Sequence, residues 1–210
     1  MKNRVDMGPQ DIIEEINRQF DNAIIATDVG QHQMFTTQYI EITKNKQLIT
    51  SGGLGTMGYG FPAAIGAKLG NPDKDVIAIS GDGGMQMNIQ EFATAVLEEL
   101  PLILCVFNNE YLGMVRQWQT LFYDHRYSHT VLDDAVDFVK ISEGMGAKAF
   151  RVTKMEEVEP AIRKALAMDE PVVLDCWIDQ DLSVFPMVPA GASLNEVFDE
   201  EDMKNNEQSV

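Results

Sequence analysis

The sequence predicts an α/β protein built on a doubly wound, mainly parallel sheet with helices on both faces. Short apolar runs alternate with segments of helical pattern along most of the chain. Two of these runs end in polar motifs, Gly81-Asp82-Gly83 and Asn108-Asn109. Because parallel strands end at one edge of a sheet, we expect Asp82 and Asn109 to emerge together where open α/β sheets bind ligands.

The predicted elements follow in order from Pro9, which opens a helix with isoleucines at helical spacing. Strands are expected at 23–27, 48–50, 76–80, 102–107, 147–152 and 171–178. Further helices are expected from Pro62 to the stop at Gly70-Asn71-Pro72, and at 88–100, 134–144 and 155–167. Residues 110–130, rich in aromatics, are expected to form a long functional loop.

Length and composition favour one large domain, which we place at residues 9–198. Residues 1–8 are interpreted as a linker or remnant, and residues 199–210 as an acidic, disordered tail. The net charge of −17 argues against nucleic acid and against anionic membrane surfaces as partners. No apolar stretch approaches the length of a membrane span, and the N-terminus lacks the apolar region of a signal peptide. Cys105 and Cys176 lie in apolar runs, so a reducing cytoplasm is expected.

The motif Gly81-Asp82-Gly83-Gly84 has two interpretations. Alone, it suits a tight strand-to-helix turn with an aspartate N-cap, and Asn108-Asn109 suits an ordinary turn. At matched strand ends, however, one carboxylate and one amide oxygen are hard ligands suited to Mg²⁺, which takes its remaining ligands from water and phosphate. Glycines also let backbone N–H groups approach an anion closely. The combination therefore favours a clamp for Mg²⁺ and a diphosphate.

The segment 81–109 resembles the thiamine-diphosphate (ThDP) binding motif, a GDG triplet and a terminal asparagine pair with 24 residues between them. From about Pro9 to Phe198 the chain resembles the acetohydroxyacid synthase (acetolactate synthase) catalytic subunit, in its C-terminal ThDP-binding domain. Five separated segments carry this resemblance in the same order, Val29–Met34, Ser51–Ala67, Leu112–Gln119, Arg126–Ser128 and Val188–Ala192.

The resemblance implies roles for residues at the strand ends. Asp82, the side chain of Asn109 and the backbone carbonyl of Tyr111 would hold Mg²⁺, with diphosphate oxygens and water completing an octahedron. The diphosphate would also be bound by Gln31, His32 and the backbone of Gly83 and Gly84. His32 is otherwise interpreted as a helix-start or surface residue.

The resemblance also implies a binding site for the cofactor rings and the substrate. Met57 would support the bent cofactor between its two rings, where a flexible, polarizable side chain fills an irregular gap; the alternative is core packing. The carbonyl of Gly55 would accept a hydrogen bond from the pyrimidine amino group. Trp118 would line the substrate channel, with Met114 and Val115 in the same pocket, although an aromatic there also suits loop anchoring. Glu110, His125, Arg126 and His129 receive no catalytic role.

The reaction implied is the decarboxylation of pyruvate and the condensation of the hydroxyethyl-ThDP carbanion with pyruvate or 2-ketobutyrate, in branched-chain amino-acid biosynthesis. The family's activating glutamate belongs to an N-terminal pyrimidine-binding domain, and most FAD contacts belong to a middle domain. No segment resembles either, so the chain is expected to be an excised domain or a split-gene product, inactive alone. A homodimer or tetramer and a regulatory subunit are also implied. Two alternatives stay open: a non-catalytic ThDP/Mg²⁺-binding interaction module, and another ThDP enzyme such as pyruvate oxidase or a keto-acid decarboxylase.

Overall fold

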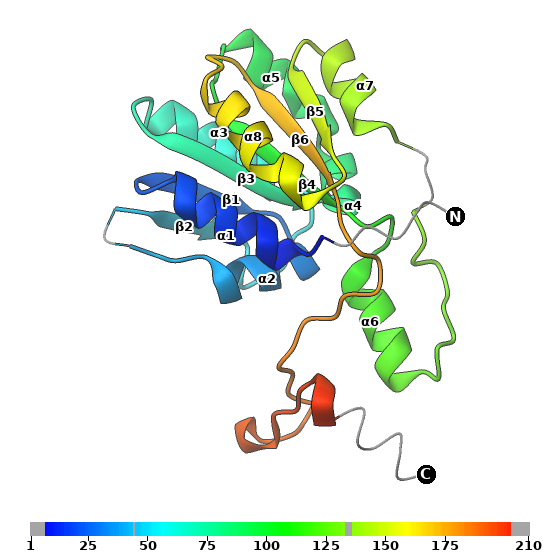
Figure 1. The fold of residues 1–210 in the computed structure, drawn as a ribbon. Coiled ribbons are helices and arrows are strands. Elements are labelled where there is room, and N and C mark those ends of the chain that lie inside the picture. The colour runs from blue at the N-terminus through cyan, green and yellow to red at the C-terminus, as the bar shows by residue number, and fades with distance from the viewer. Residues whose placement is uncertain (1–6, 44, 133–135, 203–210) are drawn as a thin grey trace.

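A computed structural model of the chain describes residues 7–43, 45–132 and 136–202 (Figure 1). Its centre is a six-stranded sheet in the order β2-β1-β3-β4-β6-β5, in which every neighbouring pair is parallel. The strands are β1 (Ala23–Thr27), β2 (Gln47–Thr50), β3 (Asp75–Gly81), β4 (Ile103–Asn108), β5 (Lys148–Val152) and β6 (Val172–Trp177). All six lie within one residue of the expected ends, so the predicted fold class is confirmed.

Helices cover both faces of this sheet (Figure 1). The helices are α1 (Pro9–Gln19), α2 (Gln31–Tyr39), α3 (Gly60–Gly70), α4 (Asp82–Met87), α5 (Phe92–Leu97), α6 (Gly113–Phe122), α7 (Phe138–Gly144) and α8 (Met155–Leu166). In the described part of the chain, short 3₁₀ turns are found at η1 (Ile89–Glu91) and η3 (Leu194–Glu196). Within the described ranges, no helix is long and apolar enough to cross a membrane.

Two hydrophobic cores form because successive residues of a strand point to opposite faces. In β3, Ile77 and Ile79 pack on one face with α1, α2 and α8. Val76 and Ala78 of the same strand pack on the other face with α3, α4, α5 and α7. The inner strands β1, β3 and β4 are therefore mostly apolar, as expected for strands of a parallel sheet buried on both faces.

The strand order opens the carboxyl edge of the sheet between β1 and β3. From β1 the chain continues through α2 on one face, and from β3 it continues through α4 on the other. The two segments therefore leave neighbouring strand ends in opposite directions, which is the topological switch point at which doubly wound sheets bind ligands.

One predicted helix is wrong in extent. The segment expected as a single helix over 88–100 is divided, because α4 begins at Asp82 directly after β3 and ends at Met87. The side chain of Asn88 donates to the carbonyl of Gly58 at 2.6 Å, and the chain then forms η1 and α5. A tertiary hydrogen bond therefore places the break.

Other boundaries also differ from the sequence prediction. Residues 113–122, expected within a loop, form α6, and the helix α2 was not predicted at all. The helix expected from residue 134 begins at Phe138, where the Asp137 side chain caps it by accepting from Lys140 N at 3.3 Å. Residues 1–6, 44, 133–135 and 203–210 lie outside the described residues, so most of the expected linker and tail, and the expected helix residues 134 and 135, are not described.

Candidate functional site

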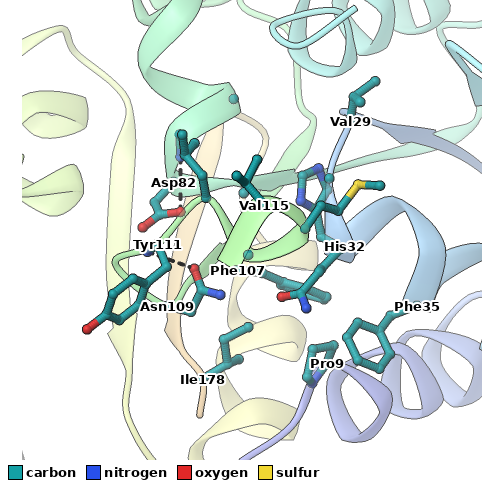
Figure 2. A pocket seen from close by; sticks show the side chains of 18 of the residues that line it. Pro9, Val29, His32, Phe35, Asp82, Phe107, Asn109, Tyr111, Val115 and Ile178 are labelled. Atoms are coloured by element: carbon teal, nitrogen blue, oxygen red, sulfur yellow. Dashed lines mark hydrogen bonds between the residues drawn. The ribbon is translucent and has the colours of Figure 1, made fainter. Parts of the chain in front are cut away.

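A cavity of about 300 Å³ lies at the carboxyl edge of β1, β3 and β4 (Figure 2). Val29 and His32 lie on one side of it, and Asp82, Asn109 and Tyr111 on the other (Figure 2). Every site residue predicted from the sequence except Trp118 lines this cavity. These residues are Gln31, His32, Gly55, Met57, Asp82, Gly83, Gly84, Asn109, Tyr111, Met114 and Val115. The structure therefore brings together segments that are 80 residues apart in the chain.

Asp28, to which the sequence analysis gave no role, shapes this cavity. It follows β1 directly and is 1% exposed. Its Oδ1 accepts from the backbone N–H groups of Val29 at 2.8 Å and Gly58 at 3.0 Å, and its Oδ2 accepts from Gly60 N at 2.8 Å. A buried carboxylate needs such donors. The hydrogen bonds tie the glycine-rich loop 51–59 to the end of β1.

The glycines around Asp28 are required by packing. A Cβ at Gly60 would overlap the Asp28 backbone, and a Cβ at Gly84 would overlap the Asp28 carboxylate. Gly84, the last residue of the motif Gly81-Asp82-Gly83-Gly84, therefore leaves room for Asp28. The Gly83 N–H group donates to Oδ1 of Asp82 at 3.0 Å.

His32 lies in the first turn of α2 with its ring between two glycines. A Cβ at Gly30 would lie 2.8 Å from the ring Cε1, and a Cβ at Gly81 would lie 2.8 Å from Nδ1. The Nε2 atom is buried and has no hydrogen-bond partner in the structure. Burial lowers the pKa of His32 to about 4, against the charge of Asp28, so the ring is neutral at pH 7. An unpartnered, buried polar atom in the wall of a cavity indicates a ligand that would complete it.

Asp82 is the buried carboxylate at the end of β3, 4% exposed. Its Oδ2 accepts from Glu110 N at 2.8 Å. Burial raises the pKa of Asp82 to about 7, although the backbone hydrogen bonds from Gly83 and Glu110 act to lower it. A cation in the cavity would relieve this desolvation, because an opposite charge favours the ionised form.

Asn109 begins a tight turn that joins β4 to this carboxylate. Its Oδ1 accepts from Tyr111 N at 3.1 Å (Figure 2). Between them, Glu110 has φ +63°, a left-handed conformation that an ordinary side chain seldom adopts. The Glu110 N–H group of this turn donates to Asp82, so the two proposed metal ligands are connected through one peptide group.

Gln31 has its amide group engaged by the protein itself. The Nε2 atom donates to Gln117 Oε1 at 2.8 Å and to the carbonyl of Leu182 at 3.1 Å. Gln117, buried in α6, in turn exchanges two hydrogen bonds with the backbone of Val184. Gln31 therefore connects α2 to α6 and to the segment after β6, and its two amide donors are occupied in this conformation.

The predicted ring and substrate residues line two hollows that share Met114 and Val115. Met57 is half-buried in the cavity wall, and Gly55 lies in the loop at φ +65°. Met114 and Val115 line both the cavity and a neighbouring open hollow of about 800 Å³. Trp118 lines only the second hollow, 44% exposed and packed edge-on against Phe122.

The donor set fits Mg²⁺ held jointly with a phosphate. Among the described residues no group of three or more His, Cys, Asp or Glu side chains forms a metal cluster. Asp82 and Asn109 instead supply a few hard oxygens beside a cavity, which suits an ion that keeps water and substrate phosphates in its shell.

Comparison with known families and sequences gives consistent matches. The family described as "Thiamine pyrophosphate enzyme, C-terminal TPP binding domain" matches residues 28–176. The acetolactate synthase large subunit of Corynebacterium glutamicum is 50% identical over 197 residues, covering 91% of this chain and 32% of that protein. The acetolactate synthase isozyme 2 large subunit of Escherichia coli is 44% identical over 178 residues, covering 85% of this chain and 32% of that protein. The chain thus spans about a third of the length of these curated relatives.

A solved structure shares the fold. The thiamine diphosphate-dependent 4-hydroxybenzoylformate decarboxylase of Rhodococcus jostii RHA1 superposes with a TM-score of 0.78 at 23% identity, covering 87% of this chain and 34% of that one. At this identity the likeness shows the architecture alone.

The buried state of His32 predicts a pH-dependent stability. Its pKa is about 4 in the folded chain and 6.5 in the unfolded chain, so between these values the unfolded chain binds more protons. The free energy of unfolding is therefore expected to fall by about 2 kcal/mol from pH 8 to pH 5 through this group. Urea denaturation of the chain and of His32→Gln checks this, because the variant lacks that component. Equal pH dependence in both proteins would show that the His32 ring is not held neutral.

Proposed function

This chain belongs to the thiamine pyrophosphate enzyme family through its C-terminal TPP binding domain, and from that membership we propose that it is the ThDP- and Mg²⁺-binding part of an acetolactate synthase. The observation that carries the proposal is the single cavity on which the metal, diphosphate and ring residues meet. Identity of 41–50% to named acetolactate synthase large subunits favours this enzyme over other ThDP enzymes.

The residues on the two sides of the cavity are proposed to bind different groups, Mg²⁺ and the diphosphate. Asp82, the Asn109 side chain and the Tyr111 carbonyl hold Mg²⁺, and His32 binds the diphosphate through its unpartnered Nε2. Gly83 and Gly84 border the diphosphate. A diphosphate next to His32 favours the protonated ring, which turns Nε2 into a donor. Gln31 reaches the diphosphate only if its amide gives up a bond to Gln117 or Leu182.

The remaining cavity residues orient the reacting end. Met57 and the Gly55 carbonyl are proposed to hold the pyrimidine and thiazolium rings. ThDP supplies, when bound, the electron sink that allows a 2-keto acid to lose CO₂ and join a second 2-keto acid. Met114, Val115 and Trp118 line the neighbouring hollow and are 37%, 49% and 44% exposed; the second keto acid would enter here. Pyruvate and 2-ketobutyrate are the proposed substrates.

Further parts of the enzyme belong to the proposal by resemblance. The activating glutamate and most contacts to FAD are assigned to domains beyond the third of the relatives that this chain matches. A dimeric or tetrameric assembly, a regulatory subunit, a role in branched-chain amino-acid biosynthesis and a cytoplasmic location complete it. The two free cysteines, Cys105 and Cys176, are both buried, which is compatible with that location.

The metal assignment predicts the behaviour of Asp82→Ala. The variant removes the charged ligand, so we expect Mg²⁺ affinity in the presence of ThDP to fall more than about 100-fold, since even partners of metal ligands are worth about 10- to 100-fold. Isothermal titration calorimetry measures it. Asp73→Ala makes the same charge change at an exposed position before β3, at the opposite edge of the sheet, and should bind normally. Undiminished binding by Asp82→Ala would remove the metal assignment.

The activity is tested by complementation. The purified 210-residue chain is expected to bind ThDP and Mg²⁺ weakly and to form no acetolactate from pyruvate. Addition of the N-terminal two thirds of the Corynebacterium glutamicum relative, made separately, is expected to produce acetolactate. Acetolactate formation by the chain alone would contradict the need for another domain. Acetaldehyde as the only product of the mixture would favour a decarboxylase, and binding without any product would favour the interaction module.

A further inference from the structure

Asp175 is a buried carboxylate in the middle of β6, and it does not line the cofactor cavity. Asp175 is 0% exposed and lies between Leu174 and Cys176, which pack into the opposite core. Burying a charge costs several kcal/mol unless donors surround it. The carboxylate therefore requires hydrogen-bond donors around it, and one of these donors, Asn108, precedes the proposed metal ligand Asn109.

Three donors converge on Asp175. The Asn108 amide Nδ2 donates to its Oδ1 at 2.9 Å, the Arg151 Nε donates to its Oδ2 at 3.0 Å, and the Trp177 indole N–H donates to Oδ2 at 3.3 Å. Arg151 also pairs with Asp137 at 2.7 Å, the residue that caps α7. The network joins β4, β5, β6 and α7.

Asn108 is thereby held by β6 through both its side chain and its backbone. Its carbonyl accepts from Ile178 N at 3.1 Å, one residue beyond the strand pairing. Asn109 is the next residue, and the turn that follows directs Glu110 N–H to Asp82. A change in the backbone conformation of Asn108 would therefore displace Asn109 and alter the contact of Glu110 with Asp82.

A second, polar cavity of about 210 Å³ lies against the same groups. Asp82, Asn108, Glu110, Asp137, Arg151 and Trp177 are among its lining residues. Asp82 thus borders the cofactor cavity on one side and the network's cavity on the other. Asn108 borders this cavity, and its side-chain amide is held by Asp175.

We propose that Asp175 is a positioning residue for the Mg²⁺ clamp: it fixes the Asn108 amide, and through it orients Asn109 and Glu110 toward Asp82. The proposal rests on the metal assignment above. Arg151 is the second member, because it orients the Asp175 carboxylate and compensates its charge. The role resembles that of outer partners which orient metal ligands without touching the ion.

The test exchanges the two hydrogen-bonding groups. Asp175→Asn removes the charge, and Asn108→Asp places two carboxylates against each other. The double variant Asn108→Asp/Asp175→Asn restores an amide–carboxylate pair with donor and acceptor reversed. Leu174→Ala is the matched control, because it loses buried contacts from the same strand on the opposite face. Melting temperatures of all variants separate stability from positioning.

Two readouts are combined. In the ligand-free chain, NMR hydrogen exchange at Glu110 and Tyr111 is expected to accelerate in both single variants, to recover in the double variant, and to stay unchanged in Leu174→Ala. Calorimetry with ThDP is expected to show Mg²⁺ binding weakened about 10- to 100-fold in the single variants, with recovery in the double variant. Leu174→Ala should lower the melting temperature but not the Mg²⁺ affinity.

The outcomes distinguish this inference from the function it rests on. If the unaltered chain binds no Mg²⁺ with ThDP, the metal assignment and the positioning role both fail. If the unaltered chain binds and the single variants bind equally well with unchanged exchange, only the role of Asp175 is overturned. Affinity losses that follow melting temperature across all variants, Leu174→Ala included, would likewise reduce Asp175 to a structural residue.

Discussion

The buried carboxylate of Asp28 is the interaction on which the geometry of the site depends. It stands where β1 ends, and its oxygens accept from the backbone of the glycine-rich loop at Gly58 and Gly60. Without those bonds the buried charge would be unpaired, at a cost of several kcal/mol. The cavity walls follow from this attachment. Gly60 and Gly84 are glycines because Asp28 fills the space a side chain would need.

The opposite wall of the cofactor cavity is formed by the turn that follows β4. Glu110, which has a left-handed backbone conformation, follows Asn109 and donates its N–H group to Asp82. The buried hydrogen bond between Asn108 and Asp175 holds the end of β4 against β6. The two buried carboxylates of this region, Asp82 and Asp175, differ in their surroundings. Asp82 lines the cavity, and burial raises its pKa to about 7; a bound cation would stabilise its ionised form. Asp175 is fully surrounded by donors.

The strands and the edge motif could be predicted from the sequence, because apolar runs buried on both faces carry a strong signal. The proximity of Asp82 and Asn109 was predicted because each follows an apolar run interpreted as one of two neighbouring parallel strands. Asp28 was missed, since an aspartate at a strand end is ordinary and its partners lie some 30 residues away. The break at Asn88 was missed for the same reason, as a side-chain bond to Gly58 creates it. The helix α6 was predicted as part of a loop because the segment is rich in aromatic residues. Its apolar residues, such as Trp118, are exposed and therefore do not mark a face buried in the core.

The central claim is that the cavity at the carboxyl edge holds Mg²⁺ and the diphosphate of ThDP between Asp82 and His32. The most direct measurement is a crystal structure of the chain grown with ThDP and Mn²⁺, with anomalous diffraction used to locate the metal. We expect an anomalous peak within coordinating distance of the oxygens of Asp82, Asn109 and the Tyr111 carbonyl, with diphosphate density reaching His32. A metal bound elsewhere, or diphosphate density outside this cavity, would contradict it.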